Sequence, residues 1–184
     1  MTTLPTPAAG KPATTRQAAP EAPVAAPQQY LTFRLGDERF AISIQSIREI
    51  IEFPGLTSIP LTPGFLAGVI NLRGAVVPVI DLSVRFGRAA TEVGRRTCIV
   101  IVEVETEDGL QALGVIVDAV DEVVDVEAAQ IETRPNFGSG IRADFVAGML
   151  RLGNRFVVAL DLDKVLSAEE LEQMIGIAAG AQPG

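Results

Sequence analysis

The sequence predicts a mostly β protein made of two similar β subdomains, with a few short helices and one helix near the C-terminus. Short Val- and Ile-rich runs recur along the chain between turns that contain Gly, Asn or Asp, a pattern typical of small barrels or sandwiches. A segment of 22 residues also recurs at a constant distance, as an internal duplication would produce. The apolar content of 48% over 184 residues is sufficient for a buried core.

The N-terminal residues 1–29 differ from the rest of the chain. They hold six of the twelve prolines and no aromatic residue, so they cannot bury enough apolar surface to offset their conformational entropy. We therefore predict a disordered arm, whose prolines interrupt the continuous apolar segment that a signal peptide requires. Residues 30–175 are predicted to form one domain of two subdomains, and residues 176–184 a flexible tail.

The first predicted element is a β-hairpin, with strands at 30–35 and 39–42 around a Gly36-Asp37 turn. Later strands follow from Val- and Ile-rich runs of strand length, some of which alternate with charged residues. These strands are predicted at 75–82, 97–105, 110–117, 120–126, 145–152 and 156–160.

Helices are few. The uncharged span 53–72 is as long as a membrane helix, but three prolines break it, so we predict a loop that ends in a strand. One short helix is predicted at 45–50. Another is predicted at 167–175, where Ser167 and Glu170 form a capping box.

The internal repeat relates residues 65–86 to residues 145–166 at a constant offset of 80. Seven of the 22 aligned positions are identical without a gap, and most of the others exchange one apolar residue for another. Upstream, residues 41–52 match residues 114–125 at an offset of 73. The shared order favours duplication over chance, so we predict two subdomains related by a rough two-fold axis, with repeat halves at about 40–86 and 113–166.

Composition excludes several classes of function. The chain has no His, so it lacks a Ser-His-Asp or Cys-His catalytic group and an imidazole metal ligand. Its single cysteine, Cys98, cannot form an intramolecular disulfide or a thiolate zinc site, and a cytoplasmic location is expected. The net charge of −8 argues against nucleic acid or an anionic membrane as a partner. We predict no cofactor, no metal and no catalytic residue.

Asp81 and Asp161 occupy equivalent repeat positions and raise the hypothesis of a two-aspartate hydrolase, in which paired carboxylates share a proton. The hydroxyl residue and Gly that follow the Asp in such enzymes are replaced here by Leu82-Ser83 and Leu162-Asp163. We therefore predict that each Asp caps the short helical turn after its strand.

Two further segments are predicted to have no binding or catalytic role. The ten Asp and Glu residues of 97–133 are predicted to form a solvated acidic face rather than a calcium site, because their spacing is not that of an EF-hand. Residues 137–140 are predicted to form a flexible loop.

The turn Asn71-Leu72-Arg73-Gly74 joins two apolar strands and is expected to hold Arg73 toward solvent. Arg73 is the only basic residue between Arg48 and Arg85, and its equivalent in the second repeat is Gly153. The fold therefore does not require an arginine at this turn. Two interpretations stay open at this point, a binding residue and a plain solvated turn.

Four segments carry a resemblance to a known family: LTFRLGDERFAISIQSIREI, IPLTPGFLAGVINLRGAVVPVIDL, GVIVDAVDEVVDV and GMLRLGNRFVVALDLDKVL. Over about residues 30–175 the chain resembles the CheW family of bacterial chemotaxis coupling proteins. The resemblance implies two intertwined five-stranded SH3-like β-barrels and a non-enzymatic, cytoplasmic adaptor. It also implies the partners, which are chemoreceptor cytoplasmic tips, the regulatory domain of the histidine kinase CheA and other CheW copies in array rings.

Carried onto this chain, the resemblance places Arg73 at the receptor-contacting surface. Ile47 and Glu49 match family positions implicated in receptor and kinase coupling, and Asn71, Leu72 and Gly74 are expected to shape the same groove. Two alternatives stay open: the regulatory domain of a kinase, and a coupling protein of a non-flagellar pathway such as twitching motility or second-messenger control.

Overall fold

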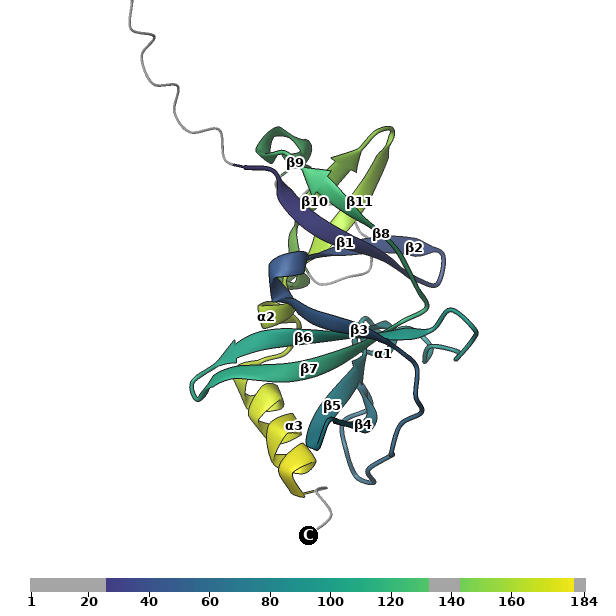
Figure 1. Ribbon diagram of the computed structural model, residues 1–184, viewed down its shortest axis with the longest axis vertical. Helices are drawn as coiled ribbons and strands as arrows, with labels where there is room; N and C mark the ends of the chain where they lie inside the picture. Colours follow the sequence, from purple (N-terminus) through teal and green to yellow (C-terminus); the bar gives the residue numbers. More distant parts are fainter. Residues whose placement is uncertain (1–25, 133–142, 181–184) are drawn as a thin grey trace, which may run out of the picture.

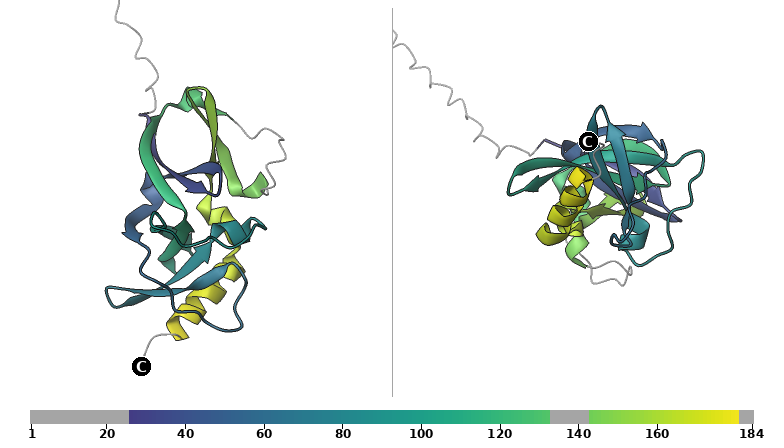
Figure 2. Two further views of the ribbon diagram at one scale, coloured as in Figure 1. Left: turned by 90° about the vertical axis from the view of Figure 1, so that its right-hand side faces the viewer. Right: turned by 90° about the horizontal axis from the view of Figure 1, so that it is seen from below.

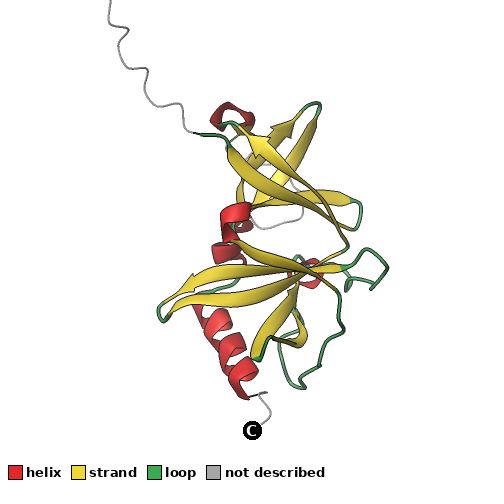
Figure 3. Cartoon of the chain, viewed as in Figure 1, coloured by secondary structure: helices red, strands yellow, loops and turns green. Residues whose placement is uncertain are grey.

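The computed structural model describes residues 26–132 and 143–180 (Figure 1). Most of the predicted arm, the predicted loop 137–140 and the last four residues lie outside these described residues. Strands dominate and helices are few (Figure 3), as the sequence predicts. The elements are β1 Gln28–Leu35, β2 Glu38–Ser43, η1 Ile44–Ser46, β3 Ile47–Glu52, β4 Leu66–Leu72, β5 Ala75–Asp81, α1 Leu82–Arg85, β6 Cys98–Thr106, β7 Gly109–Val117, β8 Ala119–Val126, η2 Ala128–Gln130, β9 Ile131–Glu132, η3 Ala143–Phe145, β10 Val146–Leu152, β11 Arg155–Leu160, α2 Leu162–Val165 and α3 Ala168–Gly180.

The strands form two sheets that lie one above the other in Figure 1. The upper sheet has the strand order β8-β1-β2-β11-β10-β9, and the lower sheet has the order β3-β6-β7-β5-β4. The chain leaves the upper sheet after β2 and returns to it at β8. Each repeat half therefore contributes strands to both sheets, and the two subdomains are intertwined.

Each sheet curls until its two edges meet, which is clearest for the upper sheet in Figure 2. In the lower sheet, the chain beyond β3 bonds to β4, with Thr57 and Val69 exchanging backbone hydrogen bonds of 3.0 and 2.9 Å. In the upper sheet, β9 follows β8 and pairs with β10 through Met149 and Leu150. The predicted pair of five-stranded barrels is confirmed, with the two-residue β9 as a sixth strand of the upper sheet.

The strand register reproduces the two sequence offsets. In the lower sheet Val79 pairs in parallel with Gly114, and in the upper sheet Ala159 pairs in parallel with Ala41. Val79 and Ala159 are 80 positions apart, and Ala41 and Gly114 are 73 positions apart. Since the same two offsets align both the sequence and the hydrogen-bonded register, the two sheets are copies of one arrangement.

The hydrophobic core has three parts. The largest lies between the two sheets, receives side chains from both, and includes a chain of ring contacts among Phe33, Phe40, Phe86 and Phe145. A smaller cluster lies inside the lower barrel and another inside the upper barrel. The shared central cluster makes the two barrels one cooperative unit. Each barrel alone would expose to water the apolar face that it turns toward the other barrel.

The helix predicted at 45–50 is wrong. A single 3-10 turn leads into β3, whose residues Ile47 and Ile51 pair with Val102 and Ile99 of β6. Burial alternates along β3, and β-branched isoleucines favour such a half-buried strand over a helix.

The chain ends of the domain also differ from the prediction. β1 begins at Gln28, inside the predicted arm, and α3 continues to Gly180 rather than ending at residue 175. Met174 and Ala178 lie one helical turn apart and are both buried, so α3 keeps an apolar stripe beyond its predicted end. None of the helices in the described ranges combines the length and apolar character needed to cross a membrane.

Candidate partner-binding site

The turn between β4 and β5 has an unusual backbone. Leu72 pairs with Ala75, which leaves Arg73 and Gly74 as a two-residue loop with φ values of +53° and +89°. Positive φ at both central residues is what a type I′ hairpin turn requires. The Asn71 side chain accepts a hydrogen bond of 2.9 Å from the Gly74 amide and thereby fixes the turn.

The left-handed backbone of Arg73 is costly for a residue with a Cβ. A non-glycine residue in this region loses about 1–2 kcal/mol relative to its usual conformations. The equivalent residue in the upper barrel, Gly153, has φ +62° and adopts this conformation without that penalty. The first repeat therefore has an arginine at this position, although the second repeat shows that the same fold forms with a glycine there.

Arg73 is held by Glu49 of β3. Its Nη1 and Nη2 donate to Oε1 and Oε2 of Glu49 at 3.0 and 2.9 Å, a two-point contact. The Arg73 side chain is 72% exposed and that of Glu49 only 20%, so the guanidinium is presented to solvent while the carboxylate lies behind it. An exposed pair of this kind contributes at most about 1 kcal/mol, less than or similar to the backbone cost of Arg73.

This ion pair joins the two edges of the lower sheet, because β3 and β4 are its outermost strands. The sequence separation of 24 residues gives no sign of the contact. The structure thus brings together Arg73, Glu49, Asn71 and Gly74 on one surface of the lower barrel.

The other two predicted site residues point into the protein. Ile47 is half-buried and packs against the central cluster, and Leu72 is half-buried and packs inside the lower barrel. They support the strands that carry Glu49 and Arg73 rather than extending the exposed surface.

A shallow apolar hollow of about 290 Å³ begins directly after the turn. Ala75 and Val76 of β5 line it together with Leu110 of β7 and Ala178 of α3, and Arg48 lies at its side. Leu110 is a large exposed apolar residue, and it lies near the tip of the β6–β7 hairpin. No sequence pattern marks this hollow, because Leu110 follows an ordinary strand pattern.

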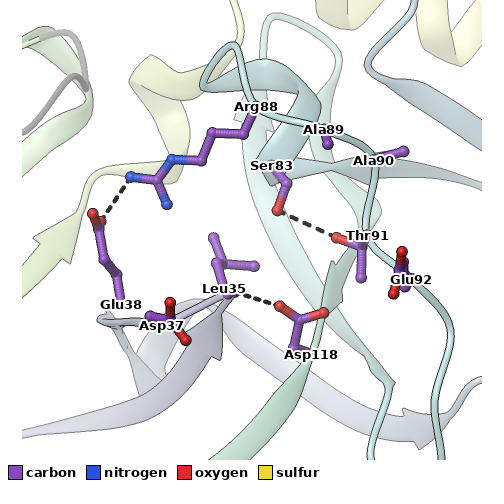
Figure 4. A pocket seen from close by; sticks show the side chains of 11 residues that line it. Leu35, Asp37, Glu38, Ser83, Arg88, Ala89, Ala90, Thr91, Glu92 and Asp118 are labelled. Carbon is purple, nitrogen blue, oxygen red and sulfur yellow. Dashed lines mark hydrogen bonds and ion pairs between the residues drawn. The ribbon is translucent and has the colours of Figure 1, made fainter.

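A larger hollow of about 480 Å³ lies where the β1–β2 turn, Asp118 and the loop after α1 meet (Figure 4). Three of its charged groups are used within the chain. Arg88 contacts Glu38 at 2.7 Å, and the Asp118 carboxylate accepts a hydrogen bond from the Gly36 amide. Among the residues that the structure describes, no group of three or more His, Cys, Asp or Glu could hold a metal ion.

The two repeat aspartates are caps, as predicted. Asp81 is 4% exposed and accepts hydrogen bonds from the Ser83 amide and from both the amide and the hydroxyl of Thr91, at 2.8–3.0 Å. Asp161 accepts from the Asp163 amide at 3.2 Å. In each repeat the amide two residues after the aspartate donates to its carboxylate, which is the arrangement of a helix N-cap, and Thr91 adds a loop contact to Asp81 alone.

Cys98 at the start of β6 is half-buried, and its thiol donates to the Arg96 carbonyl at 3.3 Å. Burial raises the pKa of the Cys98 thiol, and the negative charge of Glu52 raises it further. A raised pKa disfavours the nucleophilic thiolate, so the group behaves as a small packing residue.

In fold and in site, the chain is a double-barrel β protein whose candidate site is a charged surface turn rather than an enclosed centre. The profile of the CheW-like domain matches residues 29–170, and the chain belongs to this family. It is 34% identical over 151 residues to chemotaxis protein CheW of Klebsiella aerogenes, covering 82% of this chain and 89% of the relative. It is 34% identical over 145 residues to chemotaxis protein CheW of Rhizobium meliloti, covering 79% and 91%. Its structure matches the crystal structure of scaffolding protein TtCheW from Thermoanaerobacter tengcongensis with a TM-score of 0.69 at 33% identity, covering 77% of this chain and 88% of that one.

Proposed function

We propose that this protein is a non-enzymatic adaptor of a chemosensory array, which couples chemoreceptor cytoplasmic tips to the regulatory domain of the histidine kinase CheA in the cytoplasm. Membership of the CheW-like domain family and the double-barrel fold support the proposal. So do the names of its relatives, which are called chemotaxis proteins and, in the solved structure, a scaffolding protein.

The observation that carries the proposal is the Arg73 turn. A strained backbone at a functional site persists where the surrounding structure holds it and the side chain is needed. Arg73 has φ +53°, is 72% exposed and is oriented by Glu49. We assign this turn to the receptor contact, with Glu49 as the residue that aims the guanidinium.

An adaptor of this kind acts through geometry. Two partners that bind one rigid body experience each other at a raised effective concentration, without any new contact between them. The central core shared by both barrels supplies the rigid body. Micromolar affinity, about −8 kcal/mol, suits a complex that assembles reversibly.

The test is a binding experiment with purified full-length protein, a receptor cytoplasmic fragment and the kinase regulatory domain. Each partner is titrated alone and then in the presence of the other, with calorimetry as the readout. Binding of both partners at once, in a three-component complex, is the expected result. Binding of neither partner, or competition of the two for one surface, would contradict the proposal.

A further inference from the structure

Arg85 lies at the junction between the two barrels. It is the last residue of α1, which follows β5 of the lower barrel, and its side chain is only 16% exposed. Its equivalent in the second repeat, 80 positions later, is Val165 at the end of α2. The proposed receptor contact at Arg73 does not involve it.

The contacts of Arg85 reach both halves of the duplication. Its Nε donates to the carbonyl of Val165 at 2.8 Å, so the side chain is bonded to its own repeat equivalent. Its guanidinium carbon lies 4.9 Å from the centre of the Phe65 ring and 5.3 Å from that of Phe145. Phe65 and Phe145 are themselves a repeat pair.

These distances locate the guanidinium between the two repeats. It is almost equally far from two repeat-related rings and is bonded to the backbone of its own repeat equivalent. An arginine at position 165 as well would bring a second cation to the same place, and like charges in a half-buried site repel. The duplication can therefore accommodate one arginine here, which explains why Arg85 faces a valine.

The C-terminal helix holds the same group. Arg85 Nη2 donates to Glu170 Oε1 at 3.2 Å and lies 2.9 Å from Oε2, a charge contact without hydrogen-bond geometry. Four residues further, Met174 is fully buried in the central cluster. The family match ends at residue 170, so the buried part of α3 lies beyond the matched residues.

We propose that Arg85 fixes the relative orientation of the two barrels, and that α3 stabilises this orientation through the contact of Glu170 with Arg85. The aromatic pair sets where the guanidinium lies, and the Val165 carbonyl ties it to the upper repeat. The Glu170 carboxylate then couples the docking of α3 to the angle between the barrels. Cation–π contacts and charge-assisted hydrogen bonds both strengthen when they are shielded from water, as they are here.

The experiment measures the distance between two spin labels, one in each barrel, by pulsed electron paramagnetic resonance on the full chain. The labels replace Asp108 in the β6–β7 turn and Asn154 in the β10–β11 turn, both exposed, in a Cys98→Ala background. The variants are Arg85→Met, which removes every polar contact, and Arg85→Lys, which keeps the charge but loses the planar donor fork. Arg34→Met is the matched control, since Arg34 pairs with Asp121 inside the upper sheet alone.

We expect one narrow distance distribution for the unsubstituted protein and for Arg34→Met. Arg85→Met is expected to broaden or shift the distribution and to lower the Tm by about 10 °C. Arg85→Lys should give the same change in distance with a smaller loss of Tm, and it provides the measurement if Arg85→Met does not fold. A loss of Tm with an unchanged distance distribution in both Arg85 variants would overturn the proposal, because the residue would then stabilise the core without setting the angle.

Discussion

The two barrels are copies of one design, and they differ in an informative way where their equivalent β-hairpin turns meet solvent. Both barrels have the same parallel strand pairing, a bulge at the same glycine and an aspartate cap after the same strand. At the hairpin turn, however, the lower barrel has a strained Arg73 and the upper barrel a relaxed Gly153. Features that both copies keep are explained by folding, whereas a costly feature of one copy alone needs another explanation.

The same comparison separates structural from functional uses of charge. Asp81 and Asp161 are matched, and both serve as caps. Glu49 and its equivalent Glu122 are also matched in sequence. Glu49 pairs with Arg73, whereas Glu122 has no ion pair among the residues that the structure describes, and position 153 has no side chain. The matched acid therefore acquires a new role in the barrel that carries Arg73.

The largest expected effect on the free energy of unfolding comes from replacing the two capping aspartates, which should not cost the same. Asp81→Ala leaves two amides and one hydroxyl without their acceptor in a buried site, and should lower the free energy of unfolding by about 4 kcal/mol. Asp161→Ala removes one partly exposed cap bond and should cost about 1 kcal/mol. Urea unfolding of both variants measures the difference. Equal losses would show that the loop anchored through Thr91 contributes little.

The next effect concerns the glycine shared by the two bulges. A Cβ on Gly68 would lie 2.6 Å from the Thr57 carbonyl oxygen, a backbone atom of the bridge that closes the lower barrel. At Gly148 the nearest atoms would be a methyl group of Ile131 at 3.1 Å and the Glu132 carbonyl oxygen at 3.3 Å, so a shift of a few tenths of an ångström would suffice.

Gly68→Ala should therefore cost about 3 kcal/mol, and Gly148→Ala about 1 kcal/mol. Thermal unfolding of the two variants side by side measures this difference. If Gly148→Ala lowered the Tm more than Gly68→Ala, the contact of Gly68 with Thr57 would contribute less to stability than the contact of Gly148 with β9.

The smallest expected effect comes from exchanging the residues at positions 73 and 153 of the two turns. Arg73→Gly relieves the left-handed backbone but loses an exposed ion pair, so the free energy of unfolding should change by less than about 1 kcal/mol. Gly153→Arg introduces the strain and can gain only a weak exposed pair with the matched Glu122, so it should cost no more than about 1 kcal/mol. Chemical unfolding of both variants checks the signs, and a loss of several kcal/mol in Arg73→Gly would show that the turn is structural.

Much of this architecture could be predicted from the sequence. The repeat offsets of 80 and 73 appear directly in the strand register, because a duplicated strand order leaves its period in both. The caps at Asp81 and Asp161 were equally predictable, since capping depends on residues two positions away. The strand β3 was not, because Gln45 to Ile50 has an ambiguous short pattern that only its pairing with β6 resolves.

The candidate site was predictable only in part. Arg73 stands out through its turn and through the missing arginine of the second repeat. Its contact with Glu49 depends on the curling of the lower sheet, which brings strands from opposite edges together. The inward packing of Ile47 and Leu72, and the hollow beside Leu110, likewise follow from three-dimensional closure that no local pattern encodes.

The central claim is that Arg73 is present for binding and not for folding, and one titration tests it directly. The affinity of a receptor cytoplasmic fragment is measured for the unsubstituted protein and for Arg73→Gly, with the kinase regulatory domain as a second ligand and Gly153→Arg as the control. We predict about 30-fold weaker receptor binding by Arg73→Gly, close to 2 kcal/mol, with kinase binding unchanged and the control unaffected. Receptor binding by folded Arg73→Gly at the unsubstituted affinity would contradict the account.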